Sequence, residues 1–173
     1  MPVIRGQAQV SVITAEQREQ VAEQLANELS GQQTQHGPVI FEIPFNEQER
    51  IDVLVVWDAW KPFGSTDRST MILDAYKTGD SKAQIAQALG VTYREAIEQQ
   101  VLPYAVLPMI RYGEITDEDV KQAMLAEGGY ALTNGKVDLR FPMMFLAEQA
   151  HKRLADAHPK GYWSIVQTVG YLQ

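Results

Sequence analysis

The segment from Pro38 to Trp60 constrains the fold more than any other part of this chain. It reads PVIFEIPFNEQERIDVLVVWDAW. Residues 39–45 alternate between apolar and other side chains, which is typical of a strand with one face on the core. Residues 53–57 are apolar without alternation and rich in β-branched side chains, which favours a central strand covered on both faces. The segment therefore predicts a sheet with helices packed on it.

The position of the first strand in that sheet follows from Pro44. Proline has no N–H group to donate to a neighbouring strand, so this strand is expected at an edge of the sheet. The polar residues Asn46 to Arg50 are short enough for a hairpin loop between the two strands.

Length and composition favour one soluble α+β domain over residues 1–173. Apolar residues make up 45% of the chain and charged residues 21%, which is ordinary for a globular protein. The chain has no cysteine, which excludes disulfides, cysteine–zinc sites and thiol catalysis. No basic segment followed by an apolar stretch opens the chain, and no apolar run is long enough for a membrane span. We therefore expect a cytoplasmic protein without a membrane partner.

The charge pattern disfavours nucleic-acid binding. The 15 basic and 22 acidic residues give a net charge of −7, and no segment forms a basic stripe. Attraction to phosphates supplies most of the affinity of nucleic-acid-binding proteins, and this sequence lacks its usual source.

Local signals divide the rest of the chain into helices and strands. Thr14 with Gln17 and Thr92 with Glu95 form capping-box patterns that open helices. Residues 104–112 and 163–171 are predicted strands, and residues 116–128 and 142–158 are predicted helices. The Asn134-Gly135 pair predicts a type I′ hairpin in which Leu132 faces Val137.

The resulting order of elements suggests an internal duplication. If residues 81–102 form a helical-hairpin insertion, the remainder contains the unit αββαβ twice, over residues 14–112 and 116–171. We therefore predict an antiparallel or mixed sheet with helices packed on it, built from two related halves.

The expected insertion resembles a helix-turn-helix motif. In AQIAQALGVTYREAI, Ala86, Gly90 and Val91 occupy the small, turn and apolar positions of that motif. Its second helix would present Thr92, Tyr93 and Arg94 to DNA. Glu95 and Glu98 on the same helix would repel phosphates, so the favoured interpretation is a helical hairpin packed on the body of the protein.

Acidic residues near the strands are candidates for a magnesium site. Glu42, Asp52 and Asp58, with Lys61 beyond them, include the groups that a metal-dependent nuclease uses. Asp52 and Asp58 lie about 20 Å apart along an extended strand and cannot share an ion. The three histidines are too scattered for a metal motif, and no nucleotide-binding or hydrolase motif occurs. We therefore predict no catalytic residues, metal or cofactor.

The loop from Asp58 to Arg68 is the best candidate ligand site in the sequence. It joins the carboxyl end of a buried strand to the start of a helix, where open sheets commonly bind ligands. The candidate binding residues are Trp60, Lys61, Ser65, Thr66 and Arg68. They would hold a small anion, with Trp60 as a stacking wall. In the competing interpretation the loop is a connector whose tryptophan belongs to the core.

Three functions remain open on the sequence alone. The favoured one is a small non-catalytic protein that acts through a protein–protein interface, as a homodimer or with an unidentified protein partner. Self-association would cover the edge strands that Pro44 and Pro108 mark. The alternatives are an enzyme or sensor that binds an anion at residues 58–68, and DNA binding through residues 81–102.

Overall fold

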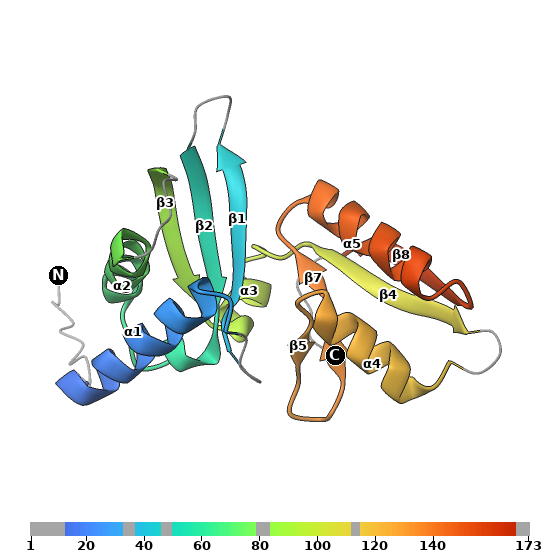
Figure 1. The fold of residues 1–173 in the computed structure, drawn as a ribbon, viewed down its shortest axis with the longest axis horizontal. Helices are drawn as coiled ribbons and strands as arrows, with labels where there is room; N and C mark the ends of the chain where they lie inside the picture. The colour runs from blue at the N-terminus through green and yellow to red at the C-terminus, as the bar shows by residue number, and fades with distance from the viewer. Residues whose placement is uncertain (1–12, 33–36, 46–49, 79–83, 112–114, 169–173) are drawn as a thin grey trace, which may run out of the picture.

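The chain has an α+β fold with two lobes (Figure 1). The structure is a computed structural model that describes residues 13–32, 37–45, 50–78, 84–111 and 115–168. The predicted hairpin loop at 46–49 lies outside these residues. In chain order the elements are α1 (Ala15–Leu29), β1 (Val39–Phe45), β2 (Arg50–Val56), the short 3-10 helix η1 (Asp58–Trp60), α2 (Ser65–Thr78), β3 (Gln84–Val91), α3 (Tyr93–Glu98), β4 (Tyr104–Arg111), α4 (Asp117–Ala126), β5 (Tyr130–Ala131), β6 (Val137–Asp138), β7 (Arg140–Phe141), α5 (Met144–Ala157) and β8 (Gly161–Gln167).

The first lobe is built on a three-stranded sheet in the order β1-β2-β3. β1 runs antiparallel to β2, and β3 runs parallel to it. The prediction that β2 is central is confirmed, as is the edge position of β1, the strand that contains Pro44. The apolar side chains of β2 point alternately to the two faces of the sheet, and both faces are covered by packed side chains.

The two faces of this sheet pack against different partners. Val53, Val55 and Trp57 point towards α1 and α2, where they join a core that includes Leu25 and Ile72. The opposite face carries Leu54 and Val56, which pack with α3 and with side chains of the second lobe. The second face therefore holds the two lobes together.

The expected helical hairpin at residues 81–102 is wrong. Residues 84–91 form strand β3 beside β2, and only Tyr93–Glu98 is helical; residues 81–83 lie outside the described residues. Ala and Gln give the segment QIAQALGV a helical composition. The open edge of a buried central strand offers backbone pairing that outweighs this local preference. Without two helices at this place, the DNA-binding hypothesis loses its structural basis.

The second lobe has its own sheet, in the order β7-β4-β8, and a small β5-β6 hairpin. β4 is antiparallel to both neighbours, and α5 packs on one face of the sheet through Ala147, Ala150 and Leu154. The strand pairing does not follow the predicted halves 14–112 and 116–171. The sequence places β4 in the first half and, because of Pro108, at a sheet edge, yet it is the central strand of the second lobe. Pro108 is accommodated there because its pairing with β8 is irregular between Pro108 and Ile110.

The Asn134-Gly135 hairpin forms with a register different from the predicted one. Ala131 pairs with Val137, and the N–H of Leu132 donates to the carbonyl oxygen of Lys136 at 2.8 Å. A type I′ turn needs positive φ at both central residues, but here only Gly135 has it, at 79°. The result is a three-residue loop with glycine in the left-handed position, which shifts the pairing by one residue.

A buried guanidinium connects α2, β3 and α3. Arg68 is 7% exposed, and its Nε–H donates to the carbonyl oxygen of Phe63 at 2.7 Å. Its Nη1–H donates to the carbonyl oxygen of Gly90 at 3.2 Å, and both Nη groups reach the carboxylate of Glu95. A side chain at Gly90 would have its Cβ only 2.8 Å from the Cβ of Arg68, so this contact requires glycine.

We expect Arg68→Met to lower the free energy of unfolding by about 2–3 kcal/mol. The loss is below that of a fully buried pair because the side chain of Glu95 is 34% exposed. Urea unfolding followed by circular dichroism measures it. Arg94→Met is the matched control, because Arg94 forms a surface pair with Glu98 and is 80% exposed. Equal losses in the two variants would contradict the structural role of Arg68.

Candidate functional site

The loop at residues 58–68 folds around a buried tryptophan. Trp60 is 0% exposed, and its Nε1–H donates to the carbonyl oxygen of Val55 at 3.3 Å. Its ring makes edge contacts with the rings of Trp57 and Phe63, at centroid distances of 5.5 Å and 6.2 Å. Trp60 is therefore a core residue and has no face open to a ligand.

The other four predicted binding residues do not converge on one point. The hydrogen-bonding groups of Arg68 are directed at protein acceptors. Lys61 is exposed and lies 3.2 Å from a carboxylate oxygen of Asp58, while Ser65 and Thr66 are exposed at the start of α2. The arrangement matches the connector interpretation more closely than an anion site.

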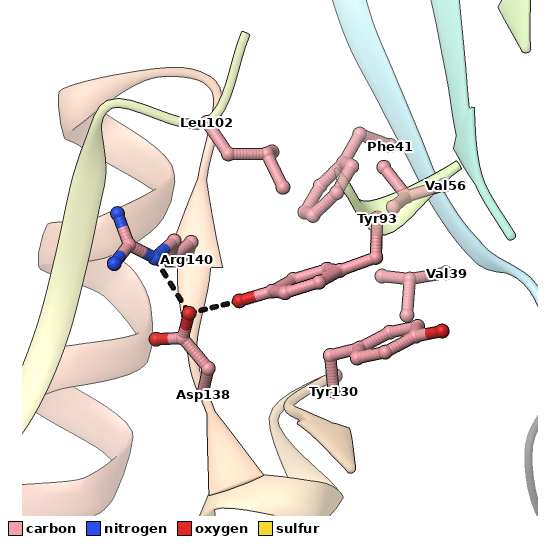
Figure 2. A pocket seen from close by; sticks show the side chains of 9 residues that line it. Val39, Phe41, Val56, Tyr93, Leu102, Tyr130, Asp138 and Arg140 are labelled. Atoms are coloured by element: carbon pink, nitrogen blue, oxygen red, sulfur yellow. Dashed lines mark hydrogen bonds and ion pairs between the residues drawn. The ribbon is translucent and has the colours of Figure 1, made fainter. Parts of the chain in front are cut away.

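Two stacked tyrosines form the junction between the lobes (Figure 2). The rings of Tyr93, from the start of α3, and Tyr130, from β5, lie parallel with centroids 4.1 Å apart. The hydroxyl of Tyr93 donates to the carboxylate of Asp138, which also accepts from Nε of Arg140 at 2.7 Å. Arg140 in turn donates to the hydroxyl of Thr168, so the chain of contacts crosses the junction into the second sheet.

Both tyrosine hydroxyls stay protonated at neutral pH. Burial raises the pKa of Tyr93 well above its ordinary value, and the hydrogen bond to Asp138 raises it further. Burial and a hydrogen bond to Asp58 raise the pKa of Tyr130 in the same way. Each phenol therefore acts as a hydrogen-bond donor to an acidic group.

Asp58 contacts residues of both lobes. It lies two residues after the end of β2, at the end of the sheet where β3 also ends. One of its oxygens accepts from the backbone N–H of Tyr93 at 3.3 Å, and the side chain also binds the hydroxyl of Tyr130. These contacts fix its carboxylate at the edge of the first sheet while 42% of its side chain remains exposed.

Two hollows of very different size adjoin the junction. The one drawn in Figure 2, between Val56, Tyr93 and Arg140, measures about 10 Å³, which is room for about one water molecule. A cleft of about 890 Å³ lies beside it, and Tyr130 lines both. The cleft is lined by Glu28, Gly37, Pro38, Val39, Ile40, Trp57, Asp58, Ala59, Leu125, Ala126, Gly128, Gly129, Tyr130, Ala131, Leu132 and Thr133.

The acidic residues that the sequence offers as a candidate magnesium site do not point to one common position. Glu42 accepts from the hydroxyl of Tyr76 at 2.6 Å, on the face of the sheet that carries Val53. Asp52 precedes Val53 on β2, so its side chain points to the other face. Within the described residues, no three His, Asp or Glu side chains are placed to hold one metal ion.

Comparisons with known proteins give no match to this chain among family models, curated proteins or solved structures. No helix in the described part of the chain is both long enough and apolar enough to cross a bilayer. A function for this protein has to be argued from its own geometry.

No pattern in the sequence indicates the junction residues. Tyr93, Tyr130 and Asp138 come from three elements with no regular spacing, and Tyr93 was assigned to a hypothetical DNA-reading helix. Of the predicted loop at 58–68, Asp58 and Ala59 line the cleft. The other residues singled out in that loop are not among those that line it.

We expect Tyr93→Phe to lower the free energy of unfolding by about 1 kcal/mol at neutral pH, because it removes the hydrogen bond to Asp138. The variant should also change how the free energy of unfolding depends on pH in the alkaline range. In the wild type, the unfolded chain loses the Tyr93 proton above about pH 10 while the folded protein keeps it, so stability falls as pH rises. Tyr93→Phe removes this contribution and should make the decline shallower.

Chemical denaturation between neutral pH and about pH 12 measures both effects, since the range spans the ordinary titration of tyrosine. Tyr162→Phe is the control, because Tyr162 is 59% exposed. If Tyr93→Phe follows the wild type at every pH, the hydrogen bond across the junction does not stabilise the fold.

Proposed function

We propose that this protein binds a small organic molecule in the cleft between its lobes. The observation that carries the proposal is the cleft itself, at about 890 Å³. That volume falls within the range of small-molecule sites, about 300–1,000 Å³. Its walls combine apolar side chains such as Val39 and Leu125 with a few polar groups, among them Asp58 and the Tyr130 hydroxyl, which is the usual composition of such sites.

The position of the cleft in the fold supports the same proposal. Strands β2 and β3 are parallel, so their carboxyl ends lie at one edge of the first sheet, and residues 57–59 line the cleft from there. Ligands in open sheets commonly bind at this edge. Residues 125–133 of the second lobe form the opposite wall, so a ligand would contact both lobes.

A ligand in the cleft should stabilise the folded protein. At one hundred times its dissociation constant a ligand adds about 2.7 kcal/mol, which raises the midpoint of thermal unfolding by several degrees. We expect at least one compound in a library of cationic, neutral and anionic metabolites to do so. Ala131→Trp should abolish the shift, because Ala131 is exposed on the wall of the cleft and the indole would fill the space.

Ala157→Trp is the matched control, because Ala157 is exposed at the end of α5 and does not line the cleft. It should keep the full shift. A library without any stabilising compound would contradict ligand binding, and equal shifts in the two tryptophan variants would place the ligand elsewhere.

A second proposal is self-association through the second sheet. One face of that sheet packs on α5, and its other side leaves apolar groups in water: Met109, Tyr162 and Val166 are 57%, 59% and 36% exposed. Residues 104–110 and 161–167 contain no charged side chain. Arg140, on β7 of the same sheet, is 11% exposed and paired with Asp138. Two copies with a net charge of −7 repel each other, so this largely apolar face is where they can meet.

The open face supports self-association better than the edge of β8 does. Nε2–H of His151 donates to the carbonyl oxygen of Trp163 at 2.9 Å, and this occupies one backbone acceptor of that strand. The contact leaves less of the edge available for pairing with another strand.

Sedimentation across a dilution series tests the second proposal. We expect the wild type to dimerise and Val166→Lys to be monomeric, because the new charge would be buried between copies. Leu73→Lys is the control, since Leu73 on α2 is also 36% exposed but lies in the first lobe. A monomeric wild type would refute the proposal, as would a Val166→Lys variant that dimerises like the control.

A further inference from the structure

The charged groups of the cleft all have the same sign. Glu28 and Asp58 line it, and among the described residues that line it none is Lys, Arg or His. We infer that the ligand of this cleft is an organic cation, an amine or quaternary ammonium compound with an apolar body. The inference rests on the proposed ligand-binding function and identifies the chemical class that the cleft selects.

Two helix ends add to the negative potential. Glu28 belongs to the last turn of α1, and Leu125 and Ala126 are the last residues of α4, so the carboxyl ends of both helices lie at the cleft. The carboxyl end of a helix carries roughly half a negative charge and favours a nearby cation. Neither helix has a basic residue in its last turn. Glu127, at the end of α4, is paired with Arg153, so that pair adds no net charge.

Asp58 is the group best placed to bind an ammonium. The N–H of Tyr93 and the hydroxyl of Tyr130 hold its carboxylate in place, so its orientation is set before a ligand arrives. Its cationic neighbour in the structure is Lys61, at 3.2 Å, whose side chain is 68% exposed. Surface pairs of this kind contribute little stability, so a ligand ammonium can take the place of Lys61 beside the same carboxylate.

The walls of the cleft suit the apolar part of such a ligand. Tyr130 is the aromatic residue of the second lobe that lines the cleft, and aromatic rings attract organic cations through the negative charge of their faces. Val39, Ile40 and Leu132 provide further apolar surface. A methylated or aryl-substituted ammonium matches these walls better than a strongly hydrated metal ion, which needs several oxygen ligands at once.

The test compares ligands that differ only in charge. Choline and its uncharged carbon isostere 3,3-dimethylbutan-1-ol have nearly the same shape, and phenethylammonium and 3-phenylpropanoate form a second pair of opposite charge. Calorimetric titration should show the cations binding at least about tenfold more tightly than their partners, a difference of about 1.4 kcal/mol. Added salt should weaken the binding of the cations.

Two substitutions should act in opposite directions on choline binding. Asp58→Asn keeps the shape of the side chain and removes its charge, so we expect affinity to fall by about tenfold. Lys61→Met removes the competing ammonium and should raise affinity by about twofold to fivefold. An anion site in the loop would respond in the reverse way to Lys61→Met. Glu148→Gln, on the exposed surface of α5, should change nothing.

The outcomes separate this inference from the proposed function. If neutral or anionic compounds bind at least as tightly as the cations, and Ala131→Trp blocks them, the cleft is a ligand site but the assignment of a cation is wrong. If none of these probes binds and the library also gives no stabilising compound, both fail. If circular dichroism shows that the wild type and Asp58→Asn are both folded and choline binds equally to the two proteins, the assigned role of Asp58 is refuted.

Discussion

The contacts of Arg68 hold together the end of the first sheet that adjoins the cleft. One guanidinium binds the carbonyl oxygens of Phe63 and Gly90 together with the carboxylate of Glu95, so the loop after β2, the end of β3 and the start of α3 are fixed to one another. Glu95 also accepts from the N–H of Thr92 in the capping box of α3, and the pKa of its carboxyl is held below its usual value, first by the hydrogen bond from Arg68. These contacts therefore hold the carboxyl ends of the two parallel strands in place relative to each other.

The second lobe contacts this end of the first sheet through aromatic and polar side chains. Tyr93 follows directly from the capped start of α3, and its ring lies on Tyr130 while its hydroxyl reaches Asp138. Because Tyr130 lines both the small hollow and the large cleft, the packing that joins the lobes also forms part of the wall of the cleft. Under the proposed function, a compound in the cleft would contact both lobes, and its binding would then depend on their relative position.

The sequence predicted those features that depend on neighbouring residues. The capping boxes at Thr14 and Thr92 and the edge position of the Pro44 strand follow from local chemistry, and all three are present. β3 was missed because the helical composition of QIAQALGV yields to pairing with β2, a contact from far along the chain. The sequence marks Asp58 as the end of a strand, as one of the acidic candidates for a magnesium site and as the start of the candidate ligand loop, but it does not indicate the partners of its side chain. Its partners come from α3 and β5, and no spacing in the sequence reveals that these elements meet.

The arrangement of β4 has a consequence for the order in which the chain acquires structure. All strands of the first sheet lie within residues 39–91, so that sheet can assemble while the rest of the chain is still being synthesised. β4 comes next, but its two neighbours β7 and β8 begin only at Arg140 and Gly161. A nascent chain therefore carries an apolar strand with two unpaired edges until β7 is made, and with one unpaired edge until β8 is made. This interval is the stage of biosynthesis most exposed to aggregation, and the one at which a chaperone would act.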